Sequence, residues 1–292
     1  MSYNLPMLSI RLGWIRALVI FILMNLGVWQ YAPVAFAQSV HAGSAKAGKE
    51  TRDDSLYASK AARRPELRWI LDTPTAGMLP RGAFDLDMRT FSQGGLQATL
   101  GIGLMDRFSV GLGYGAASVL TDTMPDYNPR LEFELKLRLL EESTELPAFA
   151  VGYSSQGYGP YDSANKRYMV KSPGFYAAFS KNIKIYSNPA GLHGGVNYSL
   201  ENEKDSDLDV FFGFNADLGE DMMFLTEYDL GLNDNKRYSV YGLGRGYLNM
   251  GLVWYMTDDL SLEFDLRNLL RNRKGASAID REARLVYVEF FY

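Results

Sequence analysis

The chain has 292 residues, of which 47% are hydrophobic and 22% are charged, and it contains 28 Gly, 19 Tyr and 16 Phe. Many glycines and aromatic residues favour strands, turns and membrane interfaces. The absence of cysteine excludes disulfides, thiolate metal sites and cysteine nucleophiles. A net charge of −4 gives no electrostatic footprint for nucleic-acid binding, so we expect no nucleic-acid partner.

The N-terminal residues 1–37 predict a cleaved signal peptide and therefore export. Arg11 and Arg16 precede a short apolar run, and the sequence AFA before Gln38 has the small-x-small cleavage pattern. The run is shorter than the roughly 18–20 residues of a spanning helix, and an uncleaved anchor is the alternative. Residues 38–66 are rich in Ala, Ser and charge, which predicts a flexible periplasmic leader.

Residues 67–81 are apolar but are interrupted by Pro74 and Pro80, which makes them a poor central strand. We expect this segment to run extended at the mouth or in the lumen of a barrel formed by residues 82–292. It would lie against the small inner faces around Gly103 and Gly113. The alternative is that these glycines only ease the curvature of the barrel.

From Ala83 to the last residue, apolar and polar residues alternate with the period of a β-strand. The hairpin Leu96–Gly115, with Asp106-Arg107 at its turn, is the model for the rest. Short and long connections alternate along the chain, as they do in outer-membrane barrels. The sequence therefore predicts an all-β fold, a closed, antiparallel, up-and-down transmembrane β-barrel of about twelve strands. We expect strands at Ala83–Phe91, Leu96–Met105, Phe108–Gly115, Arg130–Leu140, Ala148–Ser155, Gly174–Asn182, Gly191–Leu200, Leu208–Leu218, Met222–Leu230, Gly246–Met256, Leu260–Leu269 and Arg284–Tyr292.

Alternation alone does not distinguish a membrane barrel from a lipocalin-like barrel or a sandwich, which have the same pattern turned inside out. Export and charge favour the membrane barrel, because Arg or Lys on a lipid face costs about 2–4 kcal/mol at the midplane. We expect the charged and polar rows to line the lumen. The predicted lumen-lining residues are Asp85, Asp87, Arg89, Glu132, Glu134, Lys136, Arg138, His193, Glu227, Asp229, Glu263, Asp265 and Arg267.

The final strand ends on an aromatic residue and places Val286, Val288, Phe290 and Tyr292 in one apolar row. This end resembles the C-terminal signature that outer-membrane barrels present to the barrel-assembly machinery. Phe290 and Tyr292 are therefore the expected assembly signal. Expected partners are outer-membrane lipid, lipopolysaccharide, the assembly machinery and export-system proteins.

Four stretches carry a resemblance to a known group of proteins. They are ILDTPTAGMLPRGAFDLDMRTF from Ile70, LMDRFSVGLGYG, SSQGYGPY and KSPGFYAAFSKN. The region from Ile70 to Tyr292 resembles largely uncharacterised Gram-negative outer-membrane barrels. Its start is similar to barrels associated with exopolysaccharide secretion. The resemblance implies a fold and an outer-membrane location, and it brings no catalytic residues.

The sequence offers weak catalytic candidates. His193 is the base that a Ser/His lipid hydrolase would need, but the role of a polar lumen residue accounts for it much better, because no G-x-S-x-G is present and a lumenal imidazole is badly placed for acyl chains. Spaced carboxylates such as Asp85/Asp87 and Glu227/Asp229 fit salt-bridged lumen lining better than glycosidase or metal chemistry. We expect no enzyme activity, cofactor or metal.

The longest loop combines aromatic and basic residues, which suit contact with an anionic glycan or with lipopolysaccharide. These residues are Tyr158, Tyr161, Lys166, Arg167 and Tyr168. Two functions follow from the sequence as a whole. The first is a narrow pore or export-associated conduit for polysaccharide-related material, and the second is a non-conducting structural or surface-binding barrel. A lipid hydrolase is a third.

Overall fold

The structure, a computed structural model, describes residues 64–186, 188–201, 205–274 and 279–291. The predicted signal peptide and residues 38–63 of the predicted leader lie outside these ranges. Within the described ranges, the one helical element is the single 3₁₀ turn η1 (Leu232–Asp234). None of the helices there is long and apolar enough to cross a membrane.

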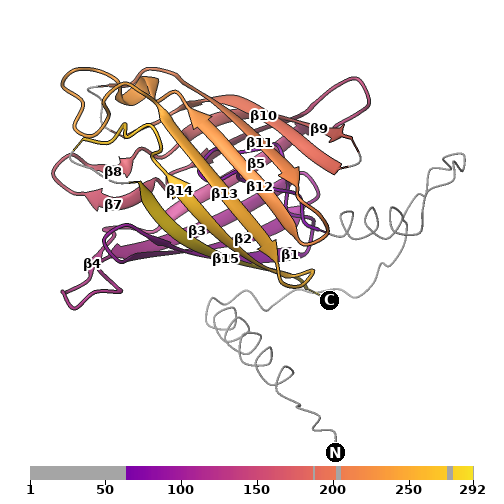
Figure 1. Cartoon of the computed structure of the whole chain (residues 1–292), viewed down its shortest axis with the longest axis horizontal. Helices are drawn as coiled ribbons and strands as arrows, with labels where there is room; N and C mark the ends of the chain where they lie inside the picture. The colour runs from indigo at the N-terminus through magenta and orange to yellow at the C-terminus, as the bar shows by residue number, and fades with distance from the viewer. Residues whose placement is uncertain (1–63, 187, 202–204, 275–278, 292) are drawn as a thin grey trace, which may run out of the picture. The chain divides into compact units, whose positions relative to one another are not determined.

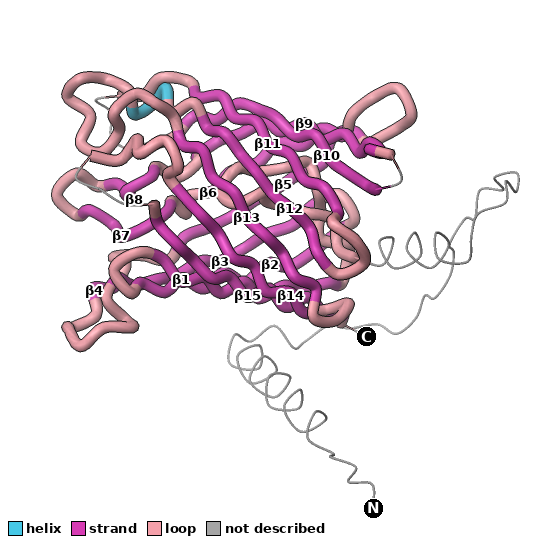
Figure 2. The backbone as a smooth tube through the Cα atoms, viewed as in Figure 1, coloured by secondary structure: helices cyan, strands magenta, loops and turns pink. Residues whose placement is uncertain are grey.

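The wall of the barrel is built from twelve strands (Figures 1 and 2). Their bounds are β1 Ala83–Phe91, β2 Gly95–Met105, β3 Phe108–Ala117, β5 Glu132–Leu140, β6 Ala148–Ser154, β9 Gly174–Ile185, β10 Asn188–Tyr198, β11 Asp209–Asp217, β12 Met222–Asp229, β13 Tyr247–Tyr255, β14 Leu260–Arg267 and β15 Asp280–Phe290. The predicted strands agree with these bounds to within a few residues.

Every wall strand pairs antiparallel with the one before it and the one after it in this series. The ring closes between the first and last strands, where Ala83 pairs with Phe290 and Arg89 pairs with Arg284. A closed ring has no free edge, so all main-chain groups of the wall find partners within the sheet. The predicted closed, up-and-down barrel of twelve strands is confirmed.

The remaining described strands lie beyond the wall. The two-residue strand β4 (Asp126–Tyr127) pairs antiparallel with the end of β3. Strands β7 (Tyr158–Asp162) and β8 (Arg167–Val170) form a separate hairpin within the longest loop. Both belong to the end of the barrel at which the longer loops gather, on the left in Figure 2. By the alternation of loop lengths this is the outer end.

The two faces of each wall strand differ in the way that a membrane barrel requires. On β5, Phe133 and Leu135 are 54% and 46% exposed, whereas Glu132 and Lys136 on either side of them are 1% and 0% exposed. The same contrast runs through most wall strands, with large apolar side chains outside and charged ones buried inside. The outside of the wall is therefore an apolar belt around a polar interior.

The last strand departs from the expected orientation. Val288 packs inside the barrel with Leu79 and Ala83, and Val286 lies against the same cluster. The register with β1 determines which residues of β15 face inward, because Arg284, two residues before Val286, faces the interior and binds Asp87 on β1. Val286 and Val288 of the predicted apolar row therefore point inward, whereas Phe290, in the same row at the end of the strand, is 44% exposed. Tyr292 lies outside the described residues.

Residues 64–81, called the plug below, occupy the interior of the barrel. Ile70, Ala76 and Leu79 are almost completely buried. Ile70 and Leu71 pack on a small apolar patch of the inner wall, formed by Met223, Leu225 and Val253. Apolar side chains on an otherwise polar inner wall thus mark the place where the plug lies.

Candidate functional site

The plug turns back on itself inside the lumen. The Ile70 amide donates to the Thr73 carbonyl at 2.9 Å, and Trp69 and Pro74 form an isolated bridge across the turn. This tight turn directs successive amides of the chain to one side. Because the turn is not part of a helix or sheet, its amides need acceptors from elsewhere in the buried interior.

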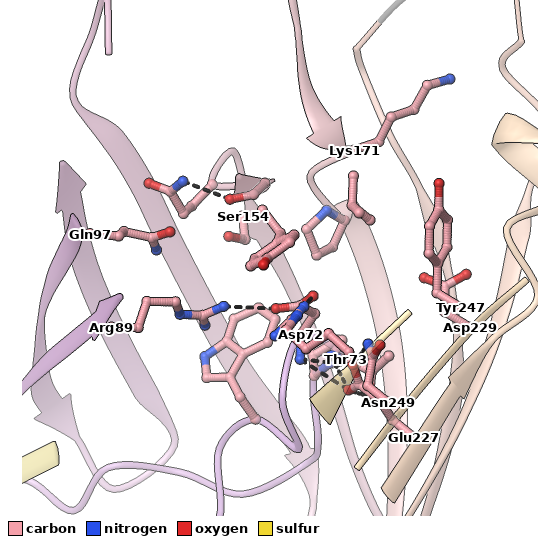
Figure 3. A pocket seen from close by; sticks show the side chains of 18 of the residues that line it. Asp72, Thr73, Arg89, Gln97, Ser154, Lys171, Glu227, Asp229, Tyr247 and Asn249 are labelled. Carbon is pink, nitrogen blue, oxygen red and sulfur yellow. Dashed lines mark hydrogen bonds and ion pairs between the residues drawn. The ribbon is translucent and has the colours of Figure 1, made fainter. Parts of the chain in front are cut away.

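Glu227 on β12 supplies those acceptors. Its carboxylate accepts hydrogen bonds from the amides of Leu71 at 3.1 Å, Asp72 at 3.0 Å and Thr73 at 2.9 Å, and from the Thr73 hydroxyl at 2.8 Å. Asn249 on β13 donates to the other carboxylate oxygen at 2.8 Å and fixes its orientation (Figure 3). One wall carboxylate therefore binds the whole turn.

Wall cations bind the plug carbonyls in the same manner. Lys136 on β5 donates to the carbonyl of Arg68 at 2.8 Å. Arg138, two residues further along the same face, donates through Nε to the carbonyl of Ala76 at 3.0 Å. The alternating charges that the sequence placed in the lumen thus act as hydrogen-bond partners for the main chain of the plug.

His193 belongs to a chain of side chains across β9, β10 and β11. Its Nδ1 lies 2.8 Å from the Ser180 hydroxyl, and its Nε2 lies 2.8 Å from Asn215 Oδ1. In serine hydrolases the nucleophile binds Nε2 and the orienting residue binds Nδ1, so the arrangement around His193 is the reverse of theirs. Here the Ser180 oxygen accepts the Ala76 amide at 2.8 Å, so the chain connects the plug to the wall.

A buried ion pair and two glycines fix the path of the plug past β1 and β2. Arg68 pairs with Asp85 and lies 3.6 Å from Glu134. A Cβ at Gly101 would overlap the Asp85 carboxylate, and a Cβ at Gly103 would overlap the Pro80 carbonyl oxygen. The plug therefore passes close to Gly103, as the sequence predicted. At Gly113 a Cβ would meet Gln156 and Thr99 instead, so that part of the expectation is wrong.

Asp72 at the tip of the plug points toward two wall arginines. Arg89 on β1 donates to its carboxylate at 2.8 Å (Figure 3). Arg267 on β14 pairs with the other oxygen. Arg267 also pairs with Glu282 at 3.4 Å and stacks on the Tyr158 ring at 3.8 Å. The carboxylate of Asp72 is thus the plug's contribution to a charge cluster that otherwise belongs to the wall.

Two cavities, each of about 80 Å³, lie in the lumen. The outer cavity extends to loop residues such as Lys171 and Asn233, and the inner one extends to the turn at Asp258 and Asp259. Arg68 and Trp69 line both cavities. These two plug residues therefore lie where the outer and inner cavities meet.

The hairpin of β7 and β8, residues 158–171, is called the cover below, because its side chains reach several sides of the outer mouth. Arg167 forms a bidentate pair with Asp234 at 2.8 and 3.0 Å, and both side chains are buried. The Tyr168 hydroxyl donates to Glu132 on β5 at 2.9 Å, and the Tyr158 hydroxyl donates to Glu282 on β15.

This burial corrects part of the expected glycan-binding set. Arg167, Tyr168 and Tyr158 are 1%, 0% and 3% exposed and are occupied by partners inside the protein. Their basic and aromatic groups bind carboxylates of the lumen and the loops inside the protein. Tyr161 and Lys166 are the members of that set that retain surface.

A second carboxylate, Glu201, lies beneath the cover in the loop after β10. It accepts the amides of Tyr168 at 3.2 Å and Ser172 at 3.1 Å, and its other oxygen is buried without a hydrogen-bond partner. Burial raises the pKa of Glu201 from 4.5 to about 7, although the two amides and Arg167 act in the opposite direction. The charge of Glu201 therefore changes near neutral pH.

The residues predicted to line the lumen fall into two groups in the structure. One group contacts the plug directly or through one side chain and comprises Asp85, Arg89, Glu134, Lys136, Arg138, His193, Glu227 and Arg267. The other group has wall or loop partners and comprises Asp87, Glu132, Asp229, Glu263 and Asp265.

Several residues of the site were not predicted from the sequence. They are Arg68, Asp72 and Thr73 of the plug and Ser180, Asn215, Asn249, Glu282 and Arg284 of the wall. The stretch DTPTAGMLP contained a usable signal, because its polar residues have no strand periodicity and two prolines remove main-chain donors. Such a segment in a buried position needs partners from the wall.

Comparisons with known proteins find one matching family model and several similar solved structures. Residues 69–180 match the model of a family described as "Exopolysaccharide biosynthesis protein YbjH", which confirms the resemblance to exopolysaccharide-associated proteins. Similar solved structures include the NanC porin, with 11% identity over 72% of this chain and 100% of that chain and a TM-score of 0.40. The KdgM porin has 8% identity over 72% and 99%, with a TM-score of 0.42.

Omp33 of Acinetobacter baumannii has 12% identity over 72% of this chain and 97% of that chain, with a TM-score of 0.40. A search of curated proteins gave no match. The fold assignment therefore depends on the closed strand order and the two strand faces of this chain, and the family match adds the association with exopolysaccharide.

Proposed function

We propose that this protein is an outer-membrane conduit associated with exopolysaccharide export, and that the plug holds its lumen closed at rest. The observation that supports this proposal most directly is the division of the lumen. Arg68 and Trp69 of the plug line both the outer and the inner cavity. Displacement of this one turn of chain would join the two compartments.

The wall does not need the plug to complete its sheet. The hydrogen bonds of the plug go to wall side chains such as Glu227, Lys136 and Ser180, whereas the wall strands bond to one another around the full ring. A purely structural barrel would fill its interior with its own side chains. A separable segment between two cavities is the arrangement expected of a gate.

The family match supports exopolysaccharide as the class of material, and the apolar belt supports insertion in the outer membrane. A lumen lined by charged and amide groups suits a hydrated, hydroxyl-rich polymer. Outer-membrane lipid and lipopolysaccharide would contact the belt. The end of β15 would be presented to the assembly machinery, and export-system proteins would contact the inner end.

A disulfide that fixes the plug to the wall tests the gate. Ala76 of the plug and Ala150 of β6 share one small buried cluster, and the natural chain has no cysteine to interfere. The Ala76→Cys/Ala150→Cys variant, refolded into planar bilayers, should show no openings when oxidised and should open after reduction. Each single cysteine variant, treated identically, is the control.

The Glu227→Ala variant supplies the opposite arm, because it removes the acceptor of the plug turn. It should conduct more than the unaltered protein. Equal, negligible conductance of the unaltered, reduced and Glu227→Ala proteins would show a non-conducting barrel, and the proposed conduit would then be wrong.

A further inference from the structure

The tip of the plug places a carboxylate in a receptor made by the wall. Arg89 and Arg267 come from β1 and β14, and both donate to Asp72. The Arg89 side chain is 12% exposed and that of Arg267 is 3% exposed, so both guanidinium groups are largely withdrawn from water. Two arginines in this setting form a strong site for a planar carboxylate.

The receptor is not saturated by Asp72. Arg89 Nε is buried without a hydrogen-bond partner, and the Asp72 side chain is 22% exposed toward the outer cavity. The receptor therefore has a spare donor and an opening beside the bound carboxylate. Since Asp72 belongs to the plug and both arginines belong to the wall, this carboxylate is exchangeable without any change in the sheet.

The rest of the outer cavity has the chemistry of a sugar site. Gln97, Thr99 and Ser154 supply amide and hydroxyl groups on one side, and the Trp69 ring supplies aromatic surface. Figure 3 shows Gln97 and Arg89 on the same flank of the cavity, with Asp72 beyond them. The cavity has a volume of about 80 Å³, room for roughly three waters at their liquid volume of about 30 Å³ each.

We propose that Arg89 and Arg267 bind the carboxylate of an acidic sugar residue, and that Asp72 occupies their site as an internal competitor. This inference depends on the proposed function for its class of ligand. An incoming acidic sugar takes the place of Asp72, and the plug turn loses its two arginine contacts. Ligand binding and plug release are then coupled, because both use the same two guanidinium groups.

The test measures binding of D-glucuronate, D-glucose and acetate to the full mature protein in detergent. The emission of Trp69, in a Trp254→Phe background, reports the cavity because Trp69 lines it. Unaltered Asp72 should weaken glucuronate binding, so Asp72→Asn should bind glucuronate about tenfold more tightly. Glucose lacks the carboxylate and acetate lacks the ring, and both should bind at least about tenfold more weakly than glucuronate.

A double variant distinguishes a purely structural role of Asp72 from competition with the ligand for the two arginines. If Asp72→Asn only loosens the plug and widens access, Asp72→Asn/Arg89→Gln should bind glucuronate as well as Asp72→Asn does. The proposal requires the double variant to lose that binding. Arg281→Gln is the matched control, because Arg281 lies on the same end of the barrel with an exposed side chain and should leave affinity unchanged.

The proposal is overturned if Asp72→Asn leaves glucuronate affinity unchanged, or if glucose or acetate binds as tightly as glucuronate. The heat-induced shift in gel mobility of the barrel confirms that each variant is folded. Conductance of the disulfide-fixed and Glu227→Ala proteins is measured without any sugar. A failure of sugar binding therefore remains distinguishable from a failure of the gate.

Discussion

The plug inside the lumen and the cover at its outer mouth are held by opposite chemistry. The plug offers main-chain amides and carbonyls, which wall ions such as Glu227 and Lys136 bind. The cover offers its own charged and aromatic side chains, Arg167 and Tyr168 above all, to carboxylates of the wall and loops. The plug is bound through its backbone, so its stability in the lumen depends on a few wall residues. The cover is bound through its side chains, so its stability depends on its own sequence.

The largest expected effect is at Glu227. The Glu227→Ala substitution leaves three amides and one hydroxyl of the plug without their acceptor. The plug-bound state should lose about 5 kcal/mol, since each buried unsatisfied donor costs about 1–3 kcal/mol. Hydrogen exchange of residues 71–73 should accelerate while the wall strands remain protected. Glu220→Ala, in an exposed turn, is the control, and unchanged exchange at the plug would refute the role of Glu227.

The corresponding substitution in the cover is Arg167→Ala. It leaves Asp234 buried without its bidentate partner, and removal of one member of a buried pair costs about 3 kcal/mol or more. Proteinase K should cleave the cover faster, while the plug amides keep their exchange protection. Lys166→Ala, at the exposed neighbouring position, should show the original cleavage rate. Loss of exchange protection at the plug in Arg167→Ala would mean that the plug and the cover unfold as one cooperative unit.

A smaller effect distinguishes the two glycines opposite the plug. A Cβ at Gly103 would overlap the Pro80 carbonyl oxygen, which is main chain and cannot rotate away. Gly103→Ala should destabilise the plug by about 2 kcal/mol through overpacking. At Gly113 the nearest atom is Gln156 Oε1 at 3.0 Å, the end of a flexible side chain, so Gly113→Ala should cost less. Equal plug exchange rates in the two variants would contradict the observed path of the plug.

The smallest effect is the pH dependence of the cover. Because the folded pKa of Glu201 is raised above its ordinary value, its contribution to cover stability is fully present below about pH 4.5. That contribution is lost as the pH rises through about 7. Proteinase K cleavage of the cover should therefore increase between pH 6 and 8, after correction for the intrinsic pH profile of the protease. Glu201→Gln should flatten this increase, and an unchanged profile in that variant would exclude Glu201 as its cause.

The wall was predictable because its signal is local. Alternating residues on β5, such as Phe133 against Glu132, define two faces without knowledge of any partner strand. Val286 and Val288 on β15 show where that reasoning fails. Their row is as apolar as any outward row, and only the register with β1 turns it toward the plug.

The site was predictable in residue type and not in role. Lys136, Arg138 and Glu227 were expected to line a wet lumen, and they instead bind the main chain of the plug. Tyr168 and Arg167 were expected at the surface and are buried, because they bind carboxylates from distant parts of the chain, Glu132 on β5 and Asp234 in η1. The chemistry of each side chain was apparent from the sequence, but its partner was not.

The sequence by itself determined the strands, their approximate number, the apolar and polar faces and the presence of a proline-broken segment before the barrel. These properties follow from side-chain period and backbone restriction, which act over a few residues. The tertiary structure decided the position of the plug, the position of the cover and the two cavities. The reason is separation along the chain, since Glu227 and the Leu71 amide are 156 positions apart and meet only when the barrel closes around the plug.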